Sequence, residues 1–445
     1  MIARSKIVSF AAVTALGACL VVDTTYDKLP PGPYRGVLYL DGRQSQRRDP
    51  DEVARAFAVD ERFGLDDVAR GELPFNFEIS YDDAGELDLT LVNGEERIAV
   101  PDVSYERLLE VARDSITVRF PLYDSYLTGY HEDGTIEGTF VDESRDGGAY
   151  AIPFAAFHGE DHRFTLLRKE PVADLTGRWA ANFGVDDTTA AYPGVAEFAQ
   201  DGNALAGTFL TPTGDYRYLA GTVQGDRAYL STFDGAHAFL FAAKLQSDSS
   251  LLGLFRSGDD FQTVWTATRD ADATLPDALS ATRALDPAAA VEIVGLTPAG
   301  ERLSTSELPG RLTVVSVFGS WCPNCRDEAV FLDSLAATLP PGEVSFVGAA
   351  FERFADTTRA LAAVGRFGAS LDLDYPLMLV GSSDKADATE RLGFLDEVRS
   401  FPTLLILDER ERVVYTHTGF AGPATSEYGP FARAFAKTLQ TLLAQ

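Results

Sequence analysis

Short apolar runs separated by turn-forming residues dominate the chain from Tyr34 to about Arg269. Stretches such as "FNFEIS", "ELDLTLVNG" and "SITVRFP" mix aromatic or β-branched residues with polar ones, and Gly, Asp and Asn interrupt them. Such runs are typical of β-strands with one buried face. Helical periodicity occurs only near 51–63 ("DEVARAFAVDERF") and near 104–114 ("SYERLLEVARD"). The pattern therefore predicts an all-β region.

The β region also looks duplicated. The segment containing Leu87 can be laid on the segment containing Leu205, at an offset of 118 residues. The segment around Gly138 can be laid on the one around Gly253, at an offset of 115 residues. We predict two meanders that each curl into a small barrel or sandwich, because closure hides strand edges; chance similarity between β-rich stretches is the alternative. The two predicted units span 34–170 and 171–269.

The pattern changes after residues 270–287, which are rich in Ala, Asp and Pro and are typical of a linker. From 288 to 445, buried strands such as "RLTVVSVF" and "VSFVGAAF" alternate with amphipathic helices such as "CRDEAVFLDSLAATL". Alternation of this kind predicts an α/β layer architecture. We therefore predict a multidomain protein with an N-terminal all-β region and a C-terminal α/β domain.

Composition narrows the possible partners. The chain is 45% hydrophobic, so it can bury real cores. Its 38 basic and 67 acidic residues give a formal net charge of −29. A field of that sign repels nucleic acid and anionic lipid, so binding to a phosphate backbone is not expected.

Residues 1–18 are typical of a signal peptide. Two basic residues precede an apolar stretch at 7–16, which is too short to span a bilayer, and small residues follow it. The string "LGAC", which ends at Cys19, resembles the lipobox of bacterial lipoproteins. That resemblance implies cleavage before Cys19 and acylation of its sulfur. An ordinary signal peptide followed by a chance cysteine is the alternative.

Export to the periplasm follows from this interpretation, with residues 19–33 as a proline-ended tether between the lipid anchor and the first β unit. Leu20, and not an aspartate, follows Cys19. By the enterobacterial sorting rule this favours the outer membrane over the inner membrane.

Only Cys322 and Cys325 remain in the mature chain, within "SWCPNC". A disulfide that closes so short a loop removes little chain entropy, so it is a poor structural staple. The motif follows a predicted strand and opens a predicted helix, where the unpaired amides and the helix dipole favour a thiolate at Cys322. We predict that Cys322 is the nucleophile and that Cys325 resolves the mixed disulfide.

Two other interpretations of the cysteine pair are an inert structural bridge and a metal site. Structural zinc needs four ligands, and neither a second Cys-x-x-Cys nor a close His pair is present. We therefore expect no metal and no cofactor other than a redox-active Cys322–Cys325 disulfide.

"VVSVFGSWCPNCRDE" followed by "SFPTLLILDERERVV" resembles the TlpA/ResA-like family of thioredoxin-fold thiol–disulfide oxidoreductases over 288–445, about a third of the chain. The resemblance implies that Trp321 flanks the disulfide and that Glu328 accepts the proton of Cys325. Pro323 suits the first helical position, where its missing amide hydrogen costs nothing. The chain departs from the family pattern after Glu328, where Ala329 and Val330 replace a frequent proline.

The same resemblance implies that Phe401, Pro402 and Thr403 form the cis-proline loop that faces the cysteines. In the family, the residue before this proline pairs its backbone with the substrate chain. A trans proline at the start of an edge strand is the alternative.

The function predicted from these observations is an exported, lipid-anchored thiol–disulfide oxidoreductase that reduces disulfides of exported proteins. A membrane thiol electron donor would keep it reduced. One alternative is a thiol peroxidase, although "GSWCPNC" does not resemble a peroxidase loop. The other is a client- or ligand-binding lipoprotein whose redox domain is accessory. The β region offers no catalytic constellation, so we predict that it spaces the redox domain from the membrane or docks partners.

Overall fold

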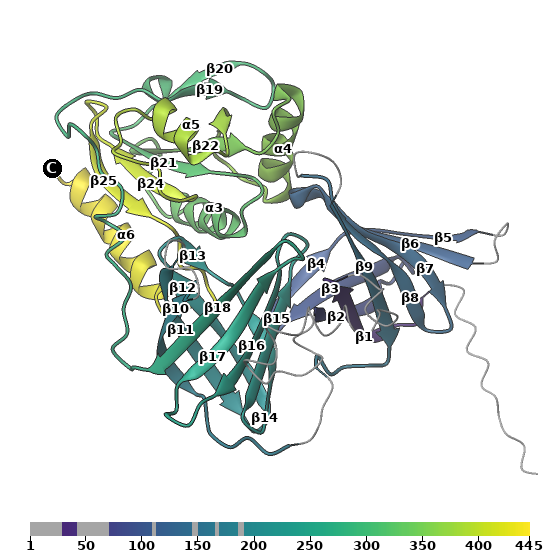
Figure 1. Cartoon of the computed structure of the whole chain (residues 1–445). Coiled ribbons are helices and arrows are strands. Elements are labelled where there is room, and N and C mark those ends of the chain that lie inside the picture. The colour runs from purple at the N-terminus through teal and green to yellow at the C-terminus, as the bar shows by residue number, and fades with distance from the viewer. Residues whose placement is uncertain (1–28, 42–70, 109–112, 145–149, 165–168, 186–190) are drawn as a thin grey trace, which may run out of the picture.

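The computed structural model describes residues 29–41, 71–108, 113–144, 150–164, 169–185 and 191–445. Two nine-stranded antiparallel sheets come first along the chain, and a seven-stranded mixed sheet follows. Figure 1 shows the C-terminal α/β domain above the second β unit, with the first β unit to the right. The predicted signal peptide, the lipidation site at Cys19 and the helical periodicity at 51–63 lie outside the described residues.

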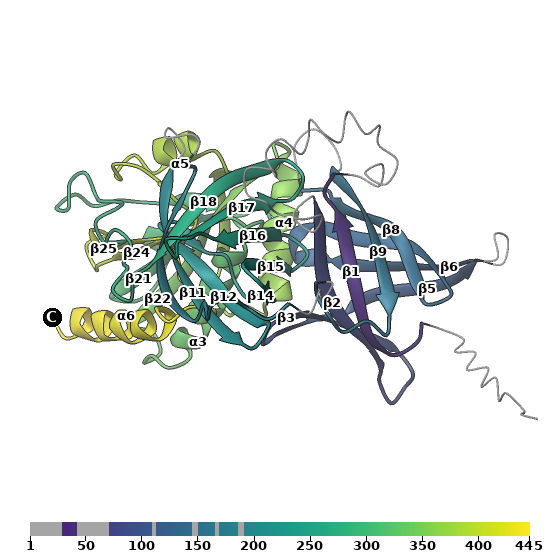
Figure 2. The same cartoon turned by 60° about the horizontal axis from the view of Figure 1, so that its bottom comes forward.

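The first β unit is an open, strongly twisted sheet with the order β4-β3-β2-β1-β9-β8-β7-β6-β5 (Figure 2). β4 and β5 follow each other in the chain but form the two edges, and no ladder joins them within the described residues. The strands, with one short 3-10 helix, are β1 (Gly32–Tyr39), β2 (Glu72–Tyr81), β3 (Leu87–Asn93), β4 (Glu96–Val100), β5 (Asp102–Leu108), β6 (Arg113–Phe120), η3 (Pro121–Tyr123), β7 (Ser125–Glu132), β8 (Thr135–Asp142) and β9 (Tyr150–His158).

The second β unit is a closed barrel. Its order is β11-β10-β18-β17-β16-β15-β14-β12-β13, and an additional β11–β12 ladder joins the two ends. The interior of the barrel is filled largely by aromatic side chains, among them Trp179, Phe209 and Trp265. The strands are β10 (Gly177–Phe183), β11 (Tyr192–Asp201), β12 (Ala204–Thr211), β13 (Gly214–Asp215), β14 (Leu219–Gln224), β15 (Arg227–Phe233), β16 (Ala238–Leu245), β17 (Leu251–Ser257) and β18 (Phe261–Arg269).

The two β units have the same strand order when β1 to β9 are matched, in chain order, with β10 to β18. The predicted duplication requires this correspondence. Leu87 lies in β3 and Leu205 in β12, which hold equivalent places in the two sheets. Gly138 in β8 and Gly253 in β17 are equivalent in the same way. The units differ in closure, because β12 pairs with both β11 and β14 whereas no ladder joins β3 to β5 among the described residues. The predicted closure is therefore confirmed for the second unit and wrong for the first, whose sheet stays open.

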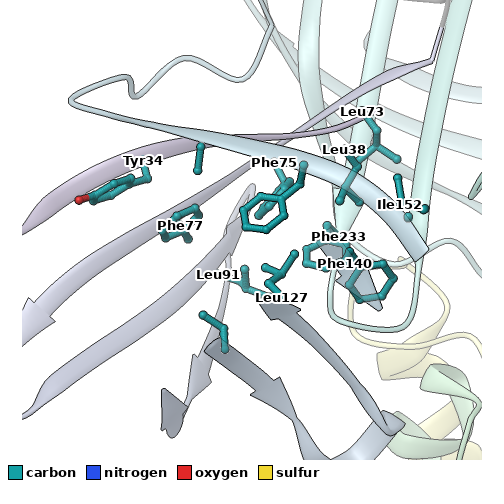
Figure 3. Packing of buried hydrophobic residues seen from close by; sticks show 14 of the residues in the cluster. Tyr34, Leu38, Leu73, Phe75, Phe77, Leu91, Leu127, Phe140, Ile152 and Phe233 are labelled. Carbon is teal, nitrogen blue, oxygen red and sulfur yellow. The ribbon is translucent and has the colours of Figure 1, made fainter. Parts of the chain in front are cut away.

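The first unit buries its apolar face against the outside of the barrel. Phe233 of β15 enters the cluster of the first unit, with ring centroids 4.7 Å from Phe75, 5.8 Å from Phe120 and 5.2 Å from Phe140 (Figure 3). β16 is buried over most of its length because alternate side chains face the barrel interior and the first unit. An open sheet is therefore stable here, since a neighbouring barrel covers its apolar face.

The helical periodicity at 104–114 is contradicted by the structure. Its described residues lie in two strands, 104–108 in β5 and 113–114 in β6, and across this ladder Tyr105 pairs with Ile116 and Arg107 with Asp114. The Tyr105 hydroxyl donates to Asp114 at 2.6 Å, and Arg107 forms an ion pair with the same carboxylate. Cross-strand pairing therefore outweighs the local periodicity.

The α/β domain has a thioredoxin-like fold with the sheet order β20-β19-β23-β22-β21-β24-β25. β21, β22 and β23 are parallel, and β24 runs antiparallel to β21. Helices cover both faces of this sheet (Figure 1). The elements are β19 (Val294–Leu296), β20 (Arg302–Ser304), η4 (Thr305–Glu307), β21 (Leu312–Phe318), α3 (Pro323–Ala336), β22 (Val344–Glu352), α4 (Thr357–Ser370), β23 (Leu377–Ser382), α5 (Lys385–Arg391), β24 (Thr403–Leu407), β25 (Val413–Thr418) and α6 (Tyr428–Leu443).

The segment 270–287, predicted as a linker, is fastened to the α/β domain in its second half. Leu285 donates its amide hydrogen to the Phe394 carbonyl at 2.8 Å, and the Thr282 hydroxyl donates to the Glu397 carbonyl at 3.0 Å. Across the described ranges, no helix has the length and apolar character needed to cross a membrane.

Candidate redox site

Cys322 lies where the central strand β21 passes into helix α3. It is the N-cap of α3, and its Sγ accepts the amide hydrogen of Cys325 at 3.4 Å. Pro323 occupies the first helical position, where no amide hydrogen is needed. The strand is buried at every position, so the rigid core of the domain positions the thiol.

The two sulfurs differ in accessibility. Cys322 is 8% exposed, whereas Cys325 is fully buried, and both are free thiols in this structure. The Cys322 thiol lies 3.6 Å from the carbonyl oxygen of Phe401, to which it donates. Burial, followed by the hydrogen bond with Cys322, raises the pKa of Cys325 well above its usual value. Cys325 is therefore a protonated thiol that needs a base before it can attack.

Glu328 lies three residues after Cys325 on α3, slightly less than one helical turn, and is completely buried. The Ser316 hydroxyl of β21 donates to Glu328 Oε2 at 2.5 Å, while Oε1 has no hydrogen-bond partner among the described residues. Burial raises the pKa of Glu328 to about 8, and the Ser316 hydrogen bond only partly opposes it. A carboxyl in this state exchanges a proton near neutral pH, as a general acid or base requires.

A second buried acid supports the loop before Cys322. Glu352, at the end of β22, accepts the amide hydrogen and the hydroxyl hydrogen of Ser320, each at 2.9 Å. Burial raises the pKa of Glu352 to about 7. Glu352 was not predicted from the sequence. Its position directly after the apolar run "VSFVGAAF" of a predicted buried strand is the feature that could have indicated a buried acid.

Trp321 and Phe401 lie together beside the cysteines. Their rings meet edge to face at 5.8 Å, and the Trp321 indole donates to the Phe351 carbonyl at 3.0 Å. The Phe401–Pro402 peptide bond is cis, and the Thr403 hydroxyl donates to the Ser400 carbonyl at 2.8 Å. The residues named from the sequence around both motifs thus converge on one face of the domain.

The described residues contain no group of three or more His, Cys, Asp or Glu side chains arranged to hold a metal ion. His417 lies on β25, where its Nδ1 is 3.1 Å from the Gly419 carbonyl. The titratable groups gathered around Cys322 are the Cys325 thiol and the buried carboxyls of Glu328 and Glu352.

Residues 280–429 match the Redoxin family, so the C-terminal part of the chain is a redoxin domain. Among curated proteins, the chain is similar to the thioredoxin-like protein YneN of Bacillus subtilis (strain 168), with 28% identity over 127 residues. The match covers 28% of this chain and 65% of that relative, so it spans less than two thirds of the relative's length.

Two solved structures are similar to the same part of the chain. One is a thiol:disulfide interchange protein of the thioredoxin family from Chlorobium tepidum TLS, 21% identical with a TM-score of 0.28, covering 36% of this chain and 99% of that one. The other is StoA from Bacillus subtilis, 20% identical with a TM-score of 0.25, covering 34% of this chain and 98% of that one.

Proposed function

We propose that this protein is an exported thiol–disulfide oxidoreductase that reduces disulfides in exported proteins. The observation that carries the proposal is the pairing of a partly exposed N-cap thiol, Cys322, with a buried thiol, Cys325, beside the buried carboxyl of Glu328. An inert bridge needs no neighbouring acid, whereas stepwise exchange needs a nucleophile, a resolving thiol and a proton acceptor.

The reaction begins with the reduced pair. The Cys322 thiolate attacks one sulfur of a client disulfide, which breaks the client S–S bond, forms a mixed disulfide and releases one client thiolate. Cys325 then passes its proton to ionised Glu328 and attacks the Cys322 sulfur. The second client thiolate leaves, and a Cys322–Cys325 disulfide forms. Two electrons move to the client, and no cofactor other than this disulfide is required.

Glu328 works in both directions of this exchange. In its ionised form it takes the proton of Cys325, and the ionised fraction grows as the pH rises toward its pKa of about 8. When a membrane thiol electron donor reduces the disulfide again, protonated Glu328 returns a proton to the departing Cys325 thiolate.

Client binding is assigned to the face formed by Trp321, Pro323, Phe401, Pro402 and Thr403. The edge-to-face pair of Trp321 and Phe401 offers an apolar surface next to Cys322. An extended client segment would lie along the backbone of Phe401.

We also propose lipid anchoring through Cys19 in the periplasm, at the outer membrane rather than the inner membrane. The lipobox-like "LGAC" and the following Leu20 support this. The β units would then hold the redox domain away from the membrane. Metabolic labelling with a radiolabelled fatty acid tests the anchor: a Cys19→Ser variant must lose the label.

A trapping experiment tests the activity. Cys325→Ser leaves the nucleophile without its resolving partner, so mixed disulfides with client proteins accumulate and can be identified by mass spectrometry. Cys322→Ser is the matched control, which retains one thiol but traps nothing. If the wild-type reduced protein fails to reduce both insulin and a small aromatic disulfide, the oxidoreductase proposal is wrong.

A further inference from the structure

The turn between β12 and β13 of the second β unit, residues 211–215, lies against the redox site. The Thr213 carbonyl is 3.2 Å from the Ser400 hydroxyl, which is also 3.1 Å from the Phe401 carbonyl. The Asp215 carbonyl accepts a hydrogen bond at 3.2 Å from the side-chain amide of Asn324, the residue between Pro323 and Cys325. One turn thus reaches both the cysteine motif and the cis-proline loop.

The same turn also contacts the loop that follows β25. The Gly422 amide donates to Asp215 Oδ2 at 2.5 Å. We call the surface formed by Asn324, Ser400 and Gly422 the redox face. All three residues are bound by the 211–215 turn, so a segment of the barrel already occupies this face.

The fit leaves no room for side chains at the centre of the contact. Gly214 has φ +147°, and a Cβ there would lie 1.9 Å from the Asn324 side-chain nitrogen. Across the contact, Gly419 has φ +76°, and a Cβ there would lie 3.0 Å from the Pro212 carbonyl oxygen. Glycine at these positions permits direct contact between backbones, as between an enzyme and an extended peptide.

A buried ion cluster fastens the end of the turn. Arg217 is 3% exposed and pairs with Asp327 of α3, with Glu96 of the first β unit and with Asp234 of its own unit. Asp327 lies two residues after Cys325. The turn is therefore held to the helix that carries the redox motif, and a cavity of about 420 Å³ lies beside Pro212 and Gly419.

We propose that the 211–215 turn, bound to the redox face directly beside Pro323 and Phe401, is a built-in competitor of extended clients, so that the second β unit controls access of polypeptide clients to Cys322. The inference rests on the proposed oxidoreductase function. An extended client that lies along Phe401 competes with the Thr213–Asp215 backbone for the redox face. A small disulfide makes no extended backbone pairing with the domain, so we expect the turn to affect its reduction little.

Gly214→Ala in the full-length reduced protein tests the inference, because the added methyl group would collide with Asn324 and therefore loosens the contact between the turn and the redox face. Gly202→Ala is the matched control: it lies in the same barrel at φ +57°, with nothing within 4 Å of a Cβ. We expect Gly214→Ala to reduce insulin roughly tenfold faster, which corresponds to about 1.4 kcal/mol of contact free energy. Reduction of a small aromatic disulfide should stay within about twofold of wild type, an effect of about 0.4 kcal/mol.

An insulin rate for Gly214→Ala equal to or below that of Gly202→Ala would overturn the inference while leaving the oxidoreductase proposal intact. Loss of small-disulfide reduction by the wild-type protein would instead remove the proposed function itself. The two failures are therefore distinguishable.

Hydrogen exchange provides a second measurement that does not depend on folding of the glycine variant. In Cys325→Ser, formation of a mixed disulfide with an insulin B-chain peptide should reduce amide protection across 213–217 and at Gly422, whose amide donates to Asp215. Unchanged protection at these amides would show that the client does not replace the turn, and the inference would be wrong.

Discussion

Two buried acids of the redoxin domain, Glu328 and Glu352, and the buried Asp234 at the junction with the β units have pKa values shifted in opposite directions. Glu328 and Glu352 have serine hydrogen-bond partners, and burial raises the pKa of each toward neutrality. At the junction, Asp234 and Asp327 pair with the buried Arg217. Burial alone would raise the pKa of Asp234, but His237 and Arg217 together hold it well below its usual value.

This difference distinguishes buried acids that can exchange a proton from a buried acid that holds the structure together. An acid without a cation in a dry environment stays protonated near neutral pH and can exchange its proton, which suits thiol chemistry. Asp234, beside His237 and the Arg217 guanidinium, is instead held in its ionised form. Burial by itself opposes the charge of Arg217, but Asp327, Glu96 and Asp234 raise its pKa well above the usual value. The guanidinium is therefore a permanent charge that joins the three parts of the molecule.

Removing the junction cation should have the largest effect. Arg217→Met leaves Glu96, Asp234 and Asp327 buried without their shared partner, so we expect the free energy of unfolding to fall by about 3–5 kcal/mol. Denaturant unfolding monitored by tryptophan fluorescence measures it. Arg302→Met is the control, because Arg302 is about half exposed and its ion pairs with Glu292 and Glu307 should be worth under about 1 kcal/mol. Equal losses for both variants would contradict the assignment.

Removing the proton acceptor in the redoxin domain should slow chemistry without destabilising the fold. In Glu328→Gln we expect resolution of the mixed disulfide by Cys325 to slow about 100-fold, as for loss of a general base. The first attack by Cys322 should keep its rate, so mixed disulfide accumulates in stopped-flow and quench experiments. Glu390→Gln, at an exposed position of α5, is the control. If both steps slow equally, Glu328 is not the proton acceptor.

The pH dependence of stability provides the most specific test. The pKa of Glu328 is about 8 in the folded protein against a usual value of 4.5. Between these values the folded state holds a proton that the unfolded state has lost, so raising the pH favours unfolding. Relative to Glu328→Gln, the reduced wild-type protein should lose up to about 1.4 kcal/mol of unfolding free energy per pH unit from pH 5 to 8. Parallel curves for the two proteins would refute an uncharged Glu328.

Local sequence patterns were enough to predict most of the secondary structure and the position of the cysteine motif. A buried apolar strand, two thiols around Pro323 and an amphipathic helix are all encoded within about 25 residues, so sequence reasoning placed them. The 104–114 segment shows the limit of that reasoning. Its apolar spacing suits a helix in isolation, but the partner strand that converts it into a hairpin supplies hydrogen bonds that local spacing does not reveal.

Apart from Ser316, which lies six residues before Cys322, the partners of the redox site came from distant parts of the chain. Ser316 and Glu352 reach the site because β21 and β22 are neighbours in the sheet, and Thr213 and Asp215 reach it because the barrel packs against the domain. None of these residues stands out by type, since serine, threonine and acidic residues occur throughout the chain.

By itself, the sequence predicted which residues carry the thiol chemistry and that two β units precede them, because the cysteine spacing and the alternation of apolar residues are properties of short segments. Only the tertiary structure decided that one unit closes while the other stays open, that burial raises the pKa of Glu328, and that a barrel turn contacts the redox face. The closure of a sheet, the pKa of a buried acid and the contact between two domains all depend on which surfaces are shielded from water. That shielding arises only when distant segments pack together.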